Sequence, residues 1–411
     1  MTARVTALGV YRPRWQDDRG TPVIGPDEDV VTMAVAAGRA ALDGAPVGRE
    51  RVDRIVLVSR TPDFVEGSTA AVIARGMNLP DSVPVEERLG GPADALDALT
   101  AARPGTLVVG VDVTPPAVAA AAIVGEQGTA VTAGARTGGS LPMRVHATGR
   151  SDVRVYDDPR LLRERGWHHV MEQLGAADGA EVVCGIPPKE LSRLPHSGDR
   201  LAAPPALGAA APLVALADLV DGGLTARLVA VEGQTGLTAD VRPDPAATRV
   251  TRDAGPRHTA PESWDPAHDA EIPLALPAYE RAFDAKIGLI AARCECGTVS
   301  YPPRTLCIEC GSTEATAPVA LPRTGEVYTG TTVHAGVPGR WGPYSLAIVQ
   351  LDDVPVRILV HVTDAPAGAV QIEGRGQLVM RLVAEREGVP DYSYGFRPEK
   401  APTEQNERVV A

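Results

Sequence analysis

Two closely spaced cysteine pairs constrain this chain more than any other sequence feature. They lie in the segment RCECGTVSYPPRTLCIECGS, as Cys294-Glu-Cys296 and Cys307-Ile-Glu-Cys310. Two tight turns can each present two thiolates, and four thiolates suit the tetrahedral coordination that zinc prefers. A glycine follows each pair and lets the backbone curl around the sulfurs. The sequence therefore predicts a zinc site with these four cysteines as its ligands.

The same cysteine pattern indicates a structural and not a catalytic metal. Four protein ligands leave no open coordination position, so the ion is expected to be structural, and its binding energy becomes folding energy. The first pair is one residue shorter than a C-x-x-C, so four reduced cysteines without a metal are the alternative. Cys184 stands apart on an apolar strand, where a buried inert thiol is expected in preference to a nucleophile.

Charge and composition narrow the partners and the compartment. The 411 residues carry a net charge of −12 without a run of Lys or Arg, and an acidic protein repels nucleic-acid backbones. The N-terminal MTARVTALGVYRPRW lacks the apolar core of a secretion signal. No stretch of about 18 apolar residues is free of Gly, Pro or charge, so no membrane span is expected. Clustered cysteines suit a reducing compartment, which predicts a cytoplasmic protein.

Hydrophobic patterning divides the chain into regions of different fold class. Up to residue 243, buried strands such as RIVLVSR and GTLVVGVDV alternate with helical segments, which predicts a covered, mainly parallel sheet in two halves of similar size. Five or so short strands after the cysteines predict a small barrel. The expected regions are an α/β domain at 1–243, a linker at 244–278, a helix (279–291) with the metal ribbon at 279–315, the barrel at 316–398 and a tail at 399–411.

The C-terminal part resembles a known family. In order it shows RCECG, SYPPR, CIECGS, GEVYTGTTVH, a PYSLAIVQLDD strand and a closing YSYGFRP. Over roughly 281–398 this is similar to the rubredoxin-like zinc-ribbon plus OB-fold proteins that accompany thiolase-superfamily enzymes. The resemblance implies a partner subunit of an acyl-CoA enzyme: a thiolase acting with HMG-CoA synthase, an aryl ketone acyltransferase or a steroid side-chain aldolase. It implies a scaffold or acyl-CoA-binding role.

An OB barrel also occurs in nucleic-acid-binding proteins, which combine a basic groove with stacking aromatic residues. Tyr328, Trp341 and Tyr344 are available for stacking, but acidic residues such as Asp352 and Asp353 are interspersed among them. Association with an acyl-CoA is therefore preferred to nucleic-acid binding, which is kept as a remote alternative.

Residues 1–243 resemble HMG-CoA synthases and β-ketoacyl-ACP synthase III. The segments ALGVYRPRW, GGPADALDAL, LGAAAPLVALADLVDGG and ARLVAVEGQTGLTADV are similar to that family's first strand, the helix after its nucleophile, the helix after its catalytic asparagine, and its last strands. The resemblance implies an α/β thiolase-like duplicated fold, layered α-β-α-β-α, followed by a zinc ribbon and a small all-β OB-fold barrel. It also implies dimerisation through the strand and helix near the nucleophile.

The catalytic positions that this resemblance implies are empty. Condensing enzymes use a cysteine at a helix N-terminus, where the helix dipole and a histidine lower its pKa. The alignment puts Arg88 or Leu89 at that position, and neither side chain can attack a thioester. The family's histidine should follow the strand that ends at Cys184, and its asparagine should precede LGAA. The segments GIPPKELSR and DRLAAPP contain neither residue.

Two functions stay open. The first is a non-catalytic subunit of an acyl-CoA or acyl-carrier C–C bond-forming complex, in which a separate active thiolase-like chain supplies the cysteine and histidine. The second is a divergent, self-sufficient acyltransferase or retro-aldolase. His196, in a Pro-flanked loop, is the preferred catalytic candidate for this self-sufficient enzyme. His168 and His169, which are neighbours on a predicted helix, are instead expected at the solvated surface.

Overall fold

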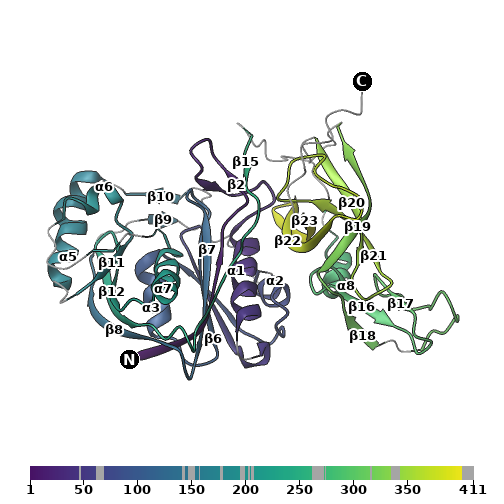
Figure 1. Cartoon of the computed structure of the whole chain (residues 1–411), viewed down its shortest axis with the longest axis horizontal. Coiled ribbons are helices and arrows are strands. Elements are labelled where there is room, and N and C mark those ends of the chain that lie inside the picture. The colour runs from purple at the N-terminus through teal and green to yellow at the C-terminus, as the bar shows by residue number, and fades with distance from the viewer. Residues whose placement is uncertain are drawn as a thin grey trace. The chain divides into compact units, whose positions relative to one another are not determined.

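A computed structural model gives the fold, and Figure 1 labels its helices and strands. The structure describes residues 1–45, 48–61, 69–140, 144–146, 153–156, 158–175, 179–194, 200–201, 204, 208–261, 273, 275–314, 317–334 and 343–399. The chain forms two compact units. The first comprises Met1–Arg12, Ala36–Phe64 and Ser82–Asp253, and the second comprises Pro13–Val35, Val65–Asp81 and Ala254–Ala411.

The first unit contains a ten-stranded sheet whose first half has a mixed strand order. Its strands are β1 (Thr2–Tyr11), β4 (Arg54–Ser59), β5 (Val85–Leu89), β6 (Thr106–Asp112) and β7 (Val118–Gly125). In space they run β5-β4-β6-β7-β1, which is 3-2-4-5-1 in chain order. β4 is parallel to β5 and β6, whereas β7 is antiparallel to both β6 and β1.

The second half repeats this arrangement. Its strands are β8 (Thr129–Thr137), β11 (Glu181–Cys184), β12 (Ala226–Glu232) and β13 (Thr235–Arg242). They run β11-β12-β13-β8, which is 2-4-5-1, and the fifth strand is again antiparallel to its neighbours. At the place that corresponds to β5, the described residues of this half contain an isolated parallel bridge between Arg200 and Glu181 of β11. β1 and β8 pair antiparallel and join the two halves.

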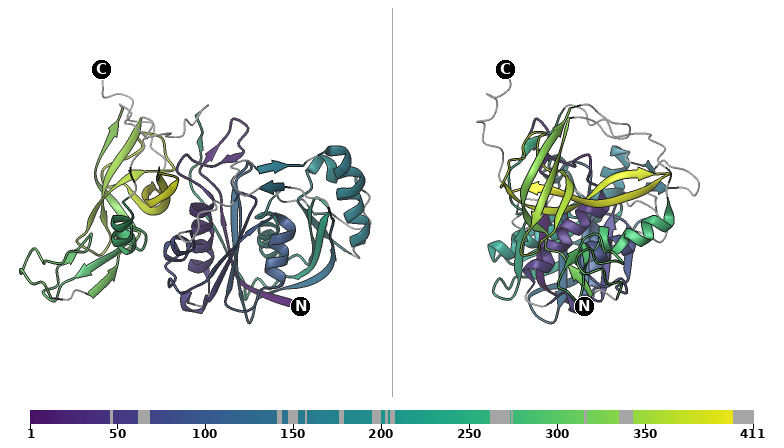
Figure 2. Two further views of the ribbon diagram at one scale, coloured as in Figure 1. Left: turned by 180° about the vertical axis from the view of Figure 1, so that it is seen from behind. Right: turned by 90° about the vertical axis from the view of Figure 1, so that its right-hand side faces the viewer.

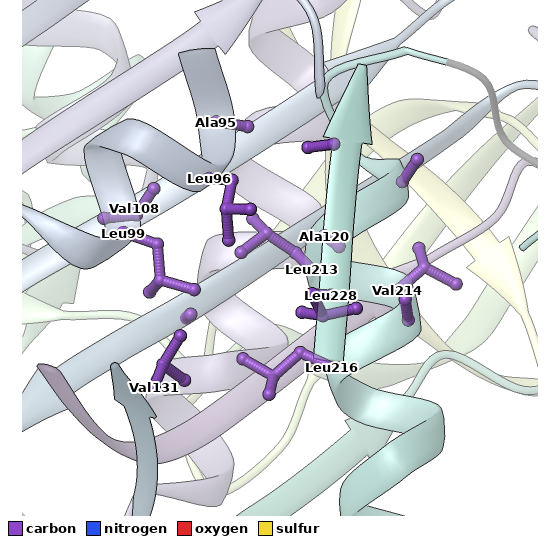
Figure 3. Packing of buried hydrophobic residues seen from close by; sticks show 14 of the residues in the cluster. Ala95, Leu96, Leu99, Val108, Ala120, Val131, Leu213, Val214, Leu216 and Leu228 are labelled. Carbon is purple, nitrogen blue, oxygen red and sulfur yellow. The ribbon is translucent and has the colours of Figure 1, made fainter. Parts of the chain in front are cut away.

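Two central helices, α3 (Pro92–Thr100) and α7 (Ala211–Gly222), pack between the halves of the sheet. α7 reads APLVALADLVDG and is apolar on nearly all sides, as expected for a helix with no solvated face. Leu96 and Leu99 of α3 meet Leu213 and Leu216 of α7 in one buried cluster, which Figure 3 shows with the strand residue Leu228. Inward-facing strand residues complete this core.

Helices also cover the outer faces of both halves. In β11, Val183 faces outward against α5 (His168–Leu174) and α6 (Pro188–Leu191), while its neighbours Val182 and Cys184 face the central helices. On the other half, Gly9 of β1 lies against α1 (Val30–Gly44), since a Cβ placed there would be 2.3 Å from the carbonyl oxygen of Ala37. The predicted α-β-α-β-α layering and its duplication are confirmed.

Smaller elements complete the first unit. They are η1 (Arg49–Arg51), β9 (Arg144–His146), β10 (Val153–Val155), α4 (Pro159–Leu161), η2 (Leu162–Trp167) and β14 (Arg249–Arg252). β14 lies within the segment expected to be a linker and pairs parallel with β1.

The second unit combines two N-terminal segments with the C-terminal region. The N-terminal segments carry β2 (Trp15–Gln16), β3 (Pro22–Val23) and α2 (Thr69–Gly76). β15 (His258–Thr259) adds to β2 and makes a three-stranded sheet with β3. The domain boundaries expected from the sequence stay a prediction.

The predicted helix over 279–291 is shorter in the structure and begins earlier. α8 spans Leu276–Lys286, and the chain then turns through Leu289, which has a left-handed φ of 52°. Residues Ile290–Arg293 form the strand β16, which pairs with β17 (Val299–Ser300) and β18 (Ala317–Ala320). The apolar run after the helix is therefore an extended strand of the ribbon.

A closed five-stranded barrel follows, and Figure 2 shows it from two further directions. Its strands are β19 (Thr324–Val333), β20 (Tyr344–Leu351), β21 (Arg357–Val362), β22 (Arg375–Arg386) and β23 (Val389–Pro398). β20 alternates between half-buried and buried residues along its whole length, which is the period of a strand with one face in a core. The predicted small all-β barrel is confirmed. Among the described residues, no helix has the length and apolar character needed to cross a membrane.

Candidate metal centre and the expected catalytic position

Two tight turns hold the four cysteines of the ribbon. The first follows β16: the N–H of Cys294 donates to the carbonyl of Thr298 and the N–H of Gly297 donates back to Cys294, both at 2.9 Å. Gly297 has a φ of +92°, a conformation that favours glycine. The short Cys-x-Cys spacing thus closes into a turn whose reversal depends on this glycine.

The second turn is built in the same way from the longer pair. The N–H of Cys307 donates to the carbonyl of Ser312 at 2.9 Å, and the N–H of Gly311 donates to the carbonyl of Cys307 at 3.0 Å. Gly311 has a φ of +70°. The glycine after each cysteine pair therefore has the role that the sequence predicted for it.

The four sulfurs converge on one point. The Sγ atoms of Cys294 and Cys310 lie 3.6 Å apart, as do those of Cys296 and Cys307, and all four lie within 4.8 Å of one another. A tetrahedral ion at about 2.3 Å from each sulfur gives sulfur–sulfur separations of roughly 3.8 Å. A disulfide needs about 2.05 Å, and all four thiols are free. This donor set fits zinc.

Local hydrogen bonds favour the thiolate form that a metal needs in two of the four cysteines. The backbone N–H groups of Cys310 and Glu309 lower the pKa of Cys307 to about 6. The side chain of Thr298, 3.3 Å from the sulfur of Cys296, lowers the pKa of that thiol with help from its own backbone. Although backbone N–H groups oppose both rises, burial and the neighbouring thiols raise the pKa of Cys294 to about 12, and the neighbouring thiols also raise the pKa of Cys310. Because zinc binds thiolates, Cys296 and Cys307 are the ligands that the turns prepare for it, whereas Cys294 and Cys310 must lose their protons to the ion.

The expected nucleophile position lies where the chain passes from β5 to α3. β5 ends at Leu89, and the helix begins at Pro92, so that Gly91 stands at the N-terminus of α3. Arg88 pairs with Glu86. Arg88 and Leu89, which the family resemblance places at the nucleophile position, are the last two residues of β5, and neither is a thiol.

A carboxylate caps the other central helix. Asp112, the last residue of β6, accepts hydrogen bonds from the N–H groups of Ala209 at 2.9 Å and Ala210 at 3.1 Å, just before α7. A Cβ at Gly208 would lie 1.7 Å from the carboxylate, so this close approach requires glycine. Burial raises the pKa of Asp112 to about 6, although the N–H of Ala210 and the guanidinium of Arg60 oppose the rise.

A second carboxylate occupies the equivalent place in the other half. Glu232 is the last residue of β12, and Arg60 pairs with it at 3.2 Å between Nε and Oε1. A Cβ at Gly91 would be 2.1 Å from Oε2 of Glu232, so this carboxylate lies directly against the start of α3. Each half therefore places an acidic residue from its fourth strand at the N-terminus of the other half's central helix.

Sequence reasoning missed Asp112, Glu232 and Arg60. The signal was present, because VVGVD and LVAVE end the two corresponding buried strands, and both close with an acidic residue. An acidic residue directly after a run of buried valines needs a partner, and helix N–H groups are the available donors.

The other candidate residues are scattered. Cys184 is buried on β11, and burial raises the pKa of its thiol to about 12, so it is an inert core thiol as predicted. His168 is exposed on α5, and the ring of His169 pairs with Gln173 at 2.9 Å. His196 lies outside the described residues.

Replacing Cys310 by serine should remove one of four metal ligands. We expect the variant to hold less zinc than the wild-type ratio of one ion per chain, and to lose several kcal/mol of folding free energy from the ribbon, since structural zinc contributes on the order of 10 kcal/mol. Elemental analysis and thermal unfolding measure both. Cys184→Ser is the control for thiol loss. Unchanged zinc content in Cys310→Ser would contradict the ligand assignment.

Replacing Asp112 by asparagine should flatten the pH dependence of stability. Because the folded pKa of about 6 exceeds the ordinary aspartate pKa of 3.8, the folded protein binds more protons between these values, and its unfolding free energy falls as the pH rises from about 4 to 6. In Asp112→Asn the unfolding free energy should no longer fall over this pH range, because the asparagine does not titrate. Urea unfolding at pH 4, 5, 6 and 7 measures it, with the exposed Asp240→Asn as control. If the unfolding free energies of Asp112→Asn and wild type changed with pH in parallel, the raised pKa of Asp112 would be contradicted.

The ribbon and barrel, on the one hand, and the α/β region, on the other, are similar to different known proteins. A family model described as the ChsH2 rubredoxin-like zinc ribbon domain matches residues 286–315, and one for the ChsH2 C-terminal OB-fold domain matches residues 318–381. The HMG synthase of the curacin biosynthetic pathway is similar over 60% of this chain and 81% of its own, at 14% identity and a TM-score of 0.46.

Two curated relatives align with a shorter part of the chain. A DUF35 domain-containing scaffold protein of Methanocaldococcus jannaschii is 33% identical over 115 residues, which are 27% of this chain and 81% of the relative. One of Pyrococcus furiosus is 33% identical over 130 residues, which are 31% of this chain and 94% of the relative. With its ribbon and barrel matching such a relative over almost its whole length, this chain belongs to the family of DUF35 domain-containing scaffold proteins.

Proposed function

We propose that this chain is a non-catalytic scaffold subunit of a complex that forms C–C bonds from acyl-CoA or acyl-carrier thioesters. A separate thiolase- or ketosynthase-like chain supplies the catalytic cysteine and histidine. The observation that carries the proposal is a pair of carboxylates: Glu232 lies at the N-terminus of α3, near which such an enzyme carries its thiolate, and Asp112 caps the N-terminus of α7. The scaffold role named for the curated relatives supports it.

The electrostatics of these helix ends argue against thioester chemistry there. Acyl transfer begins with a negatively charged thiolate and moves that charge to the carbonyl oxygen, and helix N-termini with free N–H groups stabilise such charge. Here Asp112 accepts the N–H groups of Ala209 and Ala210, and Glu232 lies against Gly91. A further anion at either helix end would meet like-charge repulsion. The helix dipoles thus stabilise the fold and leave little potential for catalysis.

The zinc ribbon and barrel have the scaffold role in this proposal. When bound, zinc supplies folding energy, because its four thiolate ligands leave no open coordination position. Cys294, Cys296, Cys307 and Cys310 hold the ribbon in shape beside the barrel strands. The barrel then contacts the acyl-CoA or acyl-carrier thioester and holds it for the partner's active site.

The partner chain, or a second copy of this chain, docks at the open edge of the first unit's sheet. β5 is the end strand, and no described strand pairs with its outer side. The carbonyl of Pro84 accepts the N–H of Ile55 on β4, and the N–H of Gly90 donates to the carbonyl of Ser59, so the alternate residues of β5 direct their peptide groups outward. Leu89, 42% exposed, is the last of these. An open strand edge can pair with another chain.

Thioester turnover tests the proposal. We expect the purified chain alone to release no coenzyme A above background from acyl-CoA substrates, because its helix ends carry no nucleophile. Turnover should follow when the thiolase-like chain that co-purifies from the native cell is added. Robust condensation by a lone homodimer, abolished by His196→Ala, would refute the proposal and support the self-sufficient acyltransferase.

Leu89→Pro tests the docking edge. Proline removes an outward N–H without touching a hydrogen bond to β4, so the chain should keep its fold and its zinc while co-elution with the partner, or with a second copy, falls at least tenfold. Leu89→Ala keeps the N–H and is the matched control. Size-exclusion chromatography with light scattering measures the loss. If Leu89→Ala weakens assembly as strongly as Leu89→Pro, a side-chain contact and not strand pairing holds the complex.

A further inference from the structure

The barrel holds an arginine that is almost completely inaccessible to solvent. Arg381, on β22, is 1% exposed. Its own strand and the preceding loop supply part of its environment: Nη1 donates to the carbonyl of Met380 at 2.9 Å, Nε donates to the hydroxyl of Thr363 at 3.1 Å, and Nη2 pairs with Asp364. A buried guanidinium is costly unless it is fully paired, so its remaining partners decide what this face of the barrel can bind.

The remaining partners come from an N-terminal segment of the same unit. The acidic triplet Asp27-Glu28-Asp29 lies against this face, with Asp27 Oδ1 3.6 Å from Nε of Arg381 and Glu28 Oε1 3.5 Å from Nη2. Asp27 also accepts the hydroxyl of Thr363 at 2.7 Å, and its carbonyl accepts the N–H of Leu382 at 3.0 Å. The triplet therefore contacts the arginine through charge and the strand through its backbone.

The third acidic residue fixes the register of the triplet. Asp29 accepts the phenol O–H of Tyr392 on β23 at 2.6 Å. The adjacent strands β22 and β23 thus contact three successive carboxylates, through Arg381 on β22 and Tyr392 on β23. Side-chain and backbone bonds at defined distances are the contacts of a recognition site for a peptide segment.

The charged residues on this face of the barrel favour an acidic segment. Asp364 is the barrel carboxylate that faces both Arg381 and Arg397, whose Nη1 lies 3.7 Å from it. On these contacts the barrel face holds two cations and one anion, and it carries an excess positive charge. Asp27 and Glu28 bring two further carboxylates to Arg381. A neutral or basic segment would leave the guanidiniums of Arg381 and Arg397 to share the single carboxylate of Asp364 in these contacts.

We propose that the Arg381 face of the barrel is a docking site for an acidic protein segment, and that this chain fills it with its own residues Asp27–Asp29. The filled site closes this face to the acidic segments of other chains. A partner of the scaffold is then recruited elsewhere on the molecule. The site itself does not depend on the function proposed above, whereas its consequence for recruitment does.

A peptide-binding experiment on the full chain tests the site. The probe is a fluorescein-labelled peptide with the sequence of residues 20–31. Wild-type protein should not bind it, because the site is filled. The triple variant Asp27→Asn, Glu28→Gln, Asp29→Asn should bind it at least tenfold more tightly than wild type, by fluorescence anisotropy. A peptide carrying the same three substitutions should not bind.

The role of the arginine is tested in the same background. Arg381→Met keeps an unbranched side chain and removes the charge, so adding it to the triple variant should abolish peptide binding. Zinc content and circular dichroism establish that each variant is folded. A folded triple variant that ignores the acidic peptide, or binds it equally well after Arg381→Met, would overturn the proposal.

A second measurement covers the case in which the triple variant does not fold. In the single variant Asp27→Asn, amide hydrogen exchange should accelerate roughly tenfold at residues 27–33 and at Leu382 together, because the segment and β22 open as one unit. Asp18→Asn, an exposed substitution in the same N-terminal segment, is the matched control and should leave both regions unchanged. Unchanged exchange in Asp27→Asn overturns the docking site. Neither measurement involves a partner chain, so its failure is distinct from a failure of the proposed function.

Discussion

The first unit depends on the attraction between the positive N-termini of its central α-helices and negatively charged side chains. Its two central helices, α3 and α7, point their N-termini toward the carboxyl ends of the sheet strands, where unpaired N–H groups and the helix dipole attract negative charge. Asp112 and Glu232 bring that charge from equivalent strands of the two halves. An enzyme of this fold class would put a thiolate or an oxyanion there. In this chain two carboxylates of the fold itself occupy those helix ends, with Arg60 as a counterion to Glu232.

The second unit depends on a different kind of stabilisation. The ribbon is small, and its strands β16, β17 and β18 are two to four residues long, so it has little apolar surface to bury. Four convergent thiols replace that missing core. The barrel has a core of its own from alternating strand residues, and it adds a buried ionic site around Arg381. Metal ligation, apolar packing and buried ion pairs thus hold three neighbouring parts of one unit.

Much of this organisation could be predicted from local sequence. The cysteine spacing and the following glycines predicted the ribbon, since ligand geometry requires only a few residues. Strand periodicity predicted the barrel, and alternating strands and helices predicted the duplicated sheet. The predicted helix over 279–291 was too long, because an apolar run fits a helix or a strand equally well. Gly288 was the available signal for a helix end, but the left-handed residue of the turn is Leu289 beside it. The contacts between Arg381 and Asp27 could not be predicted, because they join positions far apart in the sequence without a shared pattern.

The interleaving of the second unit has a consequence for biosynthesis. Residues Pro13–Val35 are translated long before β22 and β23, which contact them. At about 5–20 residues per second, the acidic triplet is synthesised on the order of tens of seconds before Arg381. The second unit therefore completes its folding only after β23 has been translated, and until then the nascent chain must keep this stretch soluble, a task for which three adjacent carboxylates are well suited.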